Sequence, residues 1–133
     1  MICKTKRMKL ELTKAEEKVM KILWKINRGL IRDIVSEYED PKPAYTTIAT
    51  IVKILEKKGF VKRKPVANSF EYSPKIQEEE YTQGFIQSFV KSYFSNSYKN
   101  LVSALSHQED MSTEDMEELV QYFQEKIHDK KTQ

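Results

Sequence analysis

Cysteine and histidine are scarce in this sequence, and their scarcity excludes several kinds of site. The 133 residues include one cysteine and two histidines. Cys3 alone permits neither a disulfide framework nor a thiolate cluster for a metal. His107 and His128 lack acidic or thiol partners at a metal-ligand spacing, so we expect both to be solvent-exposed helix residues. The sequence predicts no metal site and no cofactor.

Long apolar runs are also missing. No stretch approaches the roughly 20 residues that a membrane-spanning helix needs, and the opening MICKTKRMKLELT lacks the apolar segment of a signal peptide. Since 32% of the residues are charged and 39% are hydrophobic, we expect a soluble, cytoplasmic protein with no membrane insertion. The length allows one compact domain, or one small domain with an appendage.

The sequence lacks the combinations of residues that a catalytic site requires. Acidic clusters at 78–80 and 117–118 are neighbours on expected helices, which places most of their side chains on different azimuths, toward solvent. No nucleophile, phosphate-binding loop or metal cluster accompanies them. We therefore predict that the protein is not an enzyme.

The net charge of +3 conceals two halves of opposite sign. Residues 1–73 contain 17 Lys and Arg against 9 Asp and Glu, a net charge of +8, whereas residues 74–133 contain 6 against 11, a net charge of −5. A cationic half attracts polyanions with an affinity that falls steeply as salt rises, and an acidic half does not lie on DNA. We predict a DNA-binding domain over residues 1–73 and a second domain over residues 74–133.

The segment that ends at Gly59 has the pattern of a helix with two unlike faces. Its apolar residues recur at i, i+4, i+7, i+8 and i+11, the stripe of a helix packed on a core. The opposite face is polar apart from Ile54, and threonine there can hydrogen-bond bases or phosphates and contact a thymine methyl group. Gly59 after two lysines is typical of a helix C-terminus. The apolar stripe is Ala44, Ile48, Ile51, Val52 and Leu55, and the polar face is Thr46, Thr47, Thr50, Lys53 and Lys57.

After this helix, two short β-prone runs around a Pro/Asn/Ser turn predict a β-hairpin. The runs are residues 60–64 and 70–72. Lys62, Arg63 and Lys64 place positive charge along the first strand, where it would lie against a DNA backbone. We expect the aromatic residues of the hairpin in the core or at its base, which disfavours an RNA-stacking surface. They are Phe60, Phe70 and Tyr72.

Upstream, two further helices complete a three-helix core. Thr13 and Glu16 form a capping box for the first helix, which ends at the turn 27–29. The second helix runs from about Ile31 to Tyr38. The order helix, helix, turn, helix, hairpin is that of a winged-helix module, in which the third helix enters the major groove. The expected core positions are Val19, Ile22, Leu23, Trp24, Ile26, Ile31, Ile34 and Val35.

The acidic half is expected to be helical, with more apolar surface than its helices can enclose. Aromatic residues fall at i+4 intervals along a helical stretch from residue 75 to about 106, and Ser112 with Asp115 begins a last helix. We predict a homodimer that reads DNA half-sites about one turn apart; the alternative is that these helices fold back on the N-terminal domain. The fold class is thus mostly α with a small β-hairpin: an N-terminal winged helix-turn-helix domain followed by a C-terminal helical dimerisation domain. The predicted dimerisation residues are Phe89, Tyr93, Phe94, Tyr98, Leu101, Val102, Leu105, Leu119, Val120 and Phe123, on stripes that also contain Tyr81, Phe85, Met116 and Ile127.

With these elements identified, the sequence resembles the penicillinase-repressor family, the BlaI/MecI/CopY group of winged-helix transcriptional repressors. The resemblance runs from Leu12 to about Lys126 and rests on LTKAEEKVMKILW, AYTTIATIVKILEKKGFVKRK and MSTEDMEELV. The middle block is the specific one, because it joins the threonine face to LEKKG and the hairpin. The resemblance implies repression from a palindromic operator, bound as a dimer through the C-terminal helices.

The resemblance also implies a mode of release. In the lactam-responsive members a membrane-bound sensor protease cuts an Asn-Phe bond in the dimerisation region. The corresponding bond here is Ala104-Leu105, so the cleavage pair is absent and a sensor protease would need a different specificity. The copper-responsive branch binds metal through paired Cys-x-Cys motifs, which this sequence lacks. The inducer and any role in antibiotic resistance stay open.

These predictions assign separate roles in binding double-stranded operator DNA. The threonines of the polar face read or brace base edges, Tyr45 and Lys53 hold flanking phosphates, and the three hairpin cations anchor the wing on the backbone. The alternative from another class is an adaptor that uses its winged helix to dock on a protein and has no operator. In such an adaptor, the threonines and the hairpin cations can change without loss of the partner.

Overall fold

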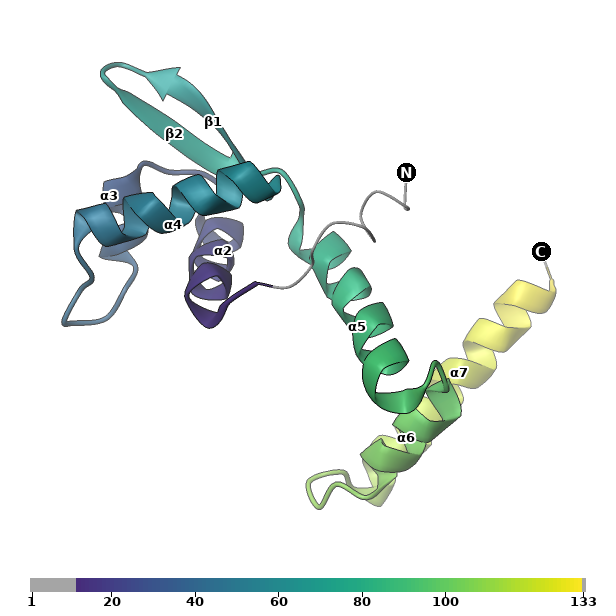
Figure 1. Ribbon diagram of the computed structural model, residues 1–133. Coiled ribbons are helices and arrows are strands. Elements are labelled where there is room, and N and C mark those ends of the chain that lie inside the picture. The colour runs from purple at the N-terminus through teal and green to yellow at the C-terminus, as the bar shows by residue number, and fades with distance from the viewer. Residues whose placement is uncertain (1–11, 133) are drawn as a thin grey trace. The chain divides into compact units, whose positions relative to one another are not determined.

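The computed structural model describes residues 12–132, which form two compact units that divide between Ile86 and Gln87. Cys3 lies outside the described residues. The first unit contains the helices and the hairpin of the basic half, and the second contains helices alone (Figure 1). The predicted fold class is confirmed: a winged helix-turn-helix arrangement is followed by a helical region.

The first described helix, α2 (Lys14–Ile26), begins with the predicted capping box. Thr13 Oγ1 accepts a hydrogen bond from the backbone N–H of Glu16 at 3.1 Å, and Glu16 Oε1 accepts one from the backbone N–H of Thr13 at 3.1 Å. The buried side of α2 includes Met20, which the predicted core omitted. Glu16 also forms an ion pair with Lys58 at 2.8 Å, so it joins the start of α2 to the end of a later helix.

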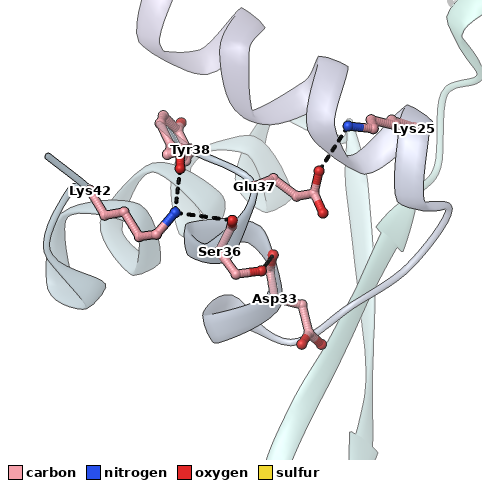
Figure 2. Close-up of polar contacts among 6 residues, drawn as sticks. All are labelled: Lys25, Asp33, Ser36, Glu37, Tyr38 and Lys42. Carbon is pink, nitrogen blue, oxygen red and sulfur yellow. Dashed lines mark hydrogen bonds and ion pairs between the residues drawn. The ribbon is translucent and has the colours of Figure 1, made fainter. Parts of the chain in front are cut away.

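The next helix, α3 (Ile31–Ser36), ends before the predicted Tyr38, and side chains fix the chain that leaves it. Lys42 Nζ donates to the carbonyl oxygen of the last helical residue at 3.1 Å and to that of Tyr38 (Figure 2). Lys25 of α2 reaches the carboxylate of Glu37 at 2.9 Å. A cation at a helix C-terminus satisfies free carbonyl groups and offsets the helix dipole. These contacts hold the loop that leads to the following helix.

That helix, α4 (Tyr45–Lys58), packs against α2 and α3. The predicted stripe is largely confirmed, since three of its members are buried and Ile51 is half-buried. Ala44 was wrongly placed in the stripe: it is the N-cap and is exposed, because its backbone has not yet entered the helix. Gly59 ends α4 with a φ of 88°, a conformation that favours glycine, as predicted. The buried members are Ile48, Val52 and Leu55.

The predicted hairpin is present as β1 (Val61–Val66) and β2 (Ser69–Pro74), which are antiparallel. The strands are longer and the turn is shorter than predicted, because pairing continues to Val66 opposite Ser69. Gly29 adds an isolated bridge to Tyr72, with hydrogen bonds of 2.9 and 2.8 Å between their backbones. The turn after α2 is thereby fixed beside the hairpin.

The core of the first unit continues beyond the hairpin into α5 (Glu78–Phe94). The Tyr81 ring is buried, 5.5 Å from the Trp24 ring and 6.1 Å from the Phe60 ring. Trp24 Nε1 donates to the carbonyl oxygen of Ile76 at 2.9 Å. Tyr81 therefore belongs to this core, although its i+4 spacing had grouped it with the outer apolar stripe. The predicted boundary at residues 73 and 74 falls at the end of β2, whereas the division into units falls within α5.

The second unit contains the end of α5 together with α6 (Tyr98–Ser106) and α7 (Thr113–Lys131). The single helical stretch predicted up to residue 106 is wrong, because it is interrupted between α5 and α6. Ser95 and Asn96 have φ of 51° and 66°, and Ser97 Oγ then caps α6 by accepting from the backbone N–H of Asn100 at 3.0 Å. The last helix has the predicted capping box of Ser112 and Asp115.

Candidate nucleic-acid interface

The outer face of α4 presents the polar residues that the sequence assigned to it. The Thr50 hydroxyl donates to the carbonyl oxygen of Thr46 at 2.9 Å, within the helix. Within the described part of the chain, the hydroxyls of Thr46 and Thr47 make no hydrogen bond. Ala44 provides no side-chain cap, so N–H groups of the first turn are available to an acceptor such as a phosphate oxygen. The exposed residues of this face are Tyr45, Thr46, Thr47, Thr50, Lys53, Ile54 and Lys57.

The three hairpin cations lie on two faces of the hairpin. Val61 is buried, and side chains alternate along a strand, so Arg63 shares the inner face with Val61. Its Nε lies 3.3 Å from Glu56 Oε2 on α4, and its guanidinium carbon lies 4.2 Å from the centre of the Phe70 ring. The alternation places the other two cations, Lys62 and Lys64, on the outer face.

The hairpin borders a groove of about 470 Å³, whose lining includes all three hairpin cations together with Arg28 and Glu71. Lys64 Nζ lies 3.7 Å from Glu71 Oε1 on the facing strand. Arg28 was not predicted as part of a site. The pairing of Gly29 with Tyr72 of β2 brings Arg28 beside the hairpin. A local sequence pattern does not show a contact between residues so far apart in the sequence.

Phe70 and Glu56 were also missed as neighbours of the candidate interface. Phe70 was expected in the core or at the hairpin base, yet it is 40% exposed and lies near the hairpin tip, opposite Pro65. Strand alternation could have placed Phe70 on the face of Arg63, since Arg63 pairs with Tyr72. The approach of Glu56 depends on how α4 meets β1, which the sequence does not show.

The Glu16–Lys58 pair fixes the C-terminal end of α4 from behind the interface. Burial alone would raise the pKa of the Glu16 carboxyl, but hydrogen bonds from Lys58 and Thr13 and the charge of Lys58 outweigh it, so the pKa lies below its ordinary value. The carboxyl is therefore ionised at neutral pH.

The second unit carries a large exposed apolar surface, and the residues predicted for dimerisation contribute to it. Among its described residues, Val90 is the one fully buried hydrophobic residue. Leu101, Phe94 and Ala104 are half-buried. Leu105, the other half of the cleavage-equivalent pair on α6, is 38% exposed. The exposed predicted residues are Phe89, Tyr93, Tyr98, Val102, Leu105, Leu119, Val120 and Phe123.

The predicted exposure of the two histidines can be compared with the described residues. His107 and His128 are exposed, as predicted, although His107 is the C-cap of α6 and lies just outside a helix. Within residues 12–132, no group of three or more His, Cys, Asp and Glu side chains could hold a metal ion. No helix in that range is both long and apolar enough to cross a membrane.

Comparison with known proteins places these features in context. The profile of the penicillinase repressor family matches residues 12–125. The methicillin resistance regulatory protein MecI of Staphylococcus aureus strain N315 is 29% identical over 110 residues, 82% of this chain and 89% of MecI. The penicillinase repressor of Bacillus licheniformis is 26% identical over 122 residues, 91% of this chain and 95% of that protein. This chain also matches a solution structure of the DNA-binding domain of the repressor BlaI. The match covers 53% of this chain and 88% of the BlaI domain, with 29% identity and a TM-score of 0.47.

Proposed function

The chain belongs to the penicillinase repressor family, and from that premise we propose that it is a cytoplasmic transcriptional repressor that binds a palindromic operator as a dimer. Two relatives over most of its length are a methicillin resistance regulator and a penicillinase repressor. The observation that carries the proposal is the exposed threonine face of α4 beside a cationic hairpin.

In this proposal α4 enters the major groove of the operator. Thr46, Thr47 and Thr50 contact or brace base edges, and Tyr45 and Lys53 hold the flanking phosphates. The hairpin cations hold the phosphate backbone beside the groove. Since phosphate contacts carry no sequence information, the threonines supply the specificity.

A titration against two DNA duplexes tests this division of roles. The purified protein is titrated at two salt concentrations with its own upstream intergenic DNA and with a scrambled duplex of equal length. Thr47→Ala should relax specificity, by about 1–3 kcal/mol if the contact is to a base. Lys62→Gln should weaken both duplexes equally and lower the salt slope by about one. Weak, non-selective binding by the wild type would instead favour the protein-docking adaptor.

We also propose that the exposed apolar surface of the second unit is the dimer interface. Its rings and aliphatic side chains are too extensive a surface for a soluble protein to leave in contact with water. Leu105→Asp or Phe94→Asp should give monomers that bind an operator poorly, because a buried, unpaired charge opposes association. A wild-type protein that sediments as a monomer at micromolar concentration would refute the dimer.

Release by a membrane sensor protease is compatible with this arrangement only under one condition. The Ala104-Leu105 bond lies inside α6, and a helical backbone must open locally before a protease can bind it as an extended chain. If cleavage of the Ala104-Leu105 bond releases the protein from DNA, the rate of cleavage should rise in variants that destabilise α6. Ser97→Ala, which removes the α6 cap, is such a variant.

A further inference from the structure

Arg63 differs from the other hairpin cations because two neighbours hold its side chain. Glu56 of α4 contacts its Nε at 3.3 Å, and the ring of Phe70 on β2 lies 4.2 Å from its guanidinium carbon. The side chain of Arg63 is 43% exposed, whereas that of Lys64 is 68% exposed. Contacts from two elements, α4 and β2, therefore restrict Arg63 more than the other hairpin cations.

These two contacts restrict different movements of the guanidinium group. Guanidinium is planar and carries five N–H donors in a fixed fork. A ring at cation–π distance restrains the position of the group, and the ion pair with Glu56 attracts the edge that carries Nε toward α4. The terminal Nη groups remain to donate to a further acceptor. A lysine ammonium in the same place would have neither a plane nor a fork to be held.

We propose that Glu56 and Phe70 are positioning residues that hold Arg63 as a fixed phosphate anchor where α4 meets the hairpin. The proposal rests on the proposed function, in which this surface binds DNA. A pre-oriented fork loses less freedom on binding a phosphate than a mobile lysine does. Arg63 thus sets the register of the hairpin on the backbone, while Lys62 and Lys64 on the outer face add attraction without a fixed geometry.

The guanidinium of Arg63 would be shared between the phosphate and the carboxylate of Glu56, which repels the phosphate. Glu56 neutralises part of the Arg63 charge in the free protein. Arg63 therefore binds a phosphate weakly when the rest of the protein makes no contact with the DNA. It becomes effective when the remaining contacts of α4 bring the backbone to it. This arrangement favours specific over non-specific binding, because random DNA lacks the base contacts that hold the backbone at that point.

Variants that keep the positive charge distinguish the effect of the fixed position of Arg63 on operator affinity from the effect of its charge. Arg63→Lys should weaken operator binding about two- to fivefold, the range expected for loss of an exposed cation–π contact, with no change in the salt slope. The matched control, Lys64→Arg, should leave the affinity within about twofold, since no ring among residues 12–132 stacks on Lys64. Phe70→Leu should reproduce the loss seen with Arg63→Lys at an unchanged salt slope, and Phe70→Tyr should retain wild-type binding.

The decisive measurement is a double-mutant cycle on operator affinity. If Phe70 acts through Arg63, Phe70→Leu should have almost no further effect when Arg63→Lys is already present. Glu56→Ala should likewise reduce the coupling between Arg63 and Phe70. Glu56→Gln should do the same, because it removes the charge of the ion pair with Arg63.

The possible outcomes distinguish failure of this inference from failure of the proposed function. If the wild type shows no selective DNA binding, the proposed function fails and the anchor fails with it. If Arg63→Gln weakens binding but the effects of Arg63→Lys and Phe70→Leu are additive, operator binding stands and the positioning role is overturned. Should Phe70→Leu fail to fold, equal affinities of Arg63→Lys and Lys64→Arg would overturn it independently.

Discussion

Replacing Glu16 with glutamine should destabilise the first unit, because Glu16 is the buried acid that connects α2 to the end of α4. Its side chain is 8% exposed and contacts Lys58, 32% exposed, at 2.8 Å. Two charges about 4 Å apart attract by roughly 1 kcal/mol in bulk water and by about 4 kcal/mol at an effective dielectric constant of 20. Since Lys58 keeps contact with water and the pair pays for desolvation, we expect the free energy of unfolding to fall by about 1–2 kcal/mol. Glutamine at this position still completes the capping box, so loss of the charge is the main change.

The size of this effect should depend on pH. The folded pKa of Glu16 is lowered from its ordinary value of 4.5, so the unfolded chain takes up a proton first as pH falls. The stabilisation by the ionised carboxyl is therefore complete well above pH 4.5 and is lost as pH falls through the folded pKa. The difference between wild type and Glu16→Gln should be present at pH 7 and should shrink toward zero in acid.

Urea unfolding followed by tryptophan fluorescence measures this difference in the free energy of unfolding of the first compact unit. Trp24 is the one tryptophan of the chain and packs in the core of the first unit. Glu39→Gln is the matched control, because Glu39 is exposed and the same charge is removed without breaking a buried pair. A Glu16→Gln variant as stable as Glu39→Gln at pH 7, or a stability difference that does not shrink at all as pH falls below 4.5, would refute the role of the ion pair.

Three further predictions test other elements. Ser112→Ala should remove the α7 cap and cost about 1 kcal/mol, seen as a loss of helical circular dichroism on heating. Ile48→Ala on the buried face of α4 should cost about 2–5 kcal/mol in urea unfolding, whereas Ile54→Ala on the outer face should cost less than about 0.5 kcal/mol; equal costs would mean that the faces are misassigned. Lys64→Gln should reduce the salt slope of DNA binding less than Lys62→Gln does, because Glu71 already neutralises part of the Lys64 charge.

The parts of the fold that were predictable depend on residues close together in sequence. The capping boxes that begin α2 and α7 each involve residues three apart, and Gly59 ends α4 through its own backbone conformation. The break after α5 was missed because Ser95 and Asn96 take positive φ without a glycine or proline to mark it. Tyr81 was misassigned because an i+4 spacing identifies one face of a helix, but not the core on which that face packs.

At the candidate interface, the distribution of charge could likewise be predicted only in part from the sequence. Sequence alone gives the basic half a net charge of +8, with its hairpin cations treated as equivalent. In the folded unit, carboxylates lie beside several of the cations, including Lys58, Arg63 and Lys64. Lys53 and Lys62, by contrast, have no acidic partner within 4 Å in the described part of the chain. The attraction for a polyanion is therefore strongest at these unpaired lysines and weaker at Lys64, whereas the ion pair of Arg63 with Glu56 joins the hairpin to α4.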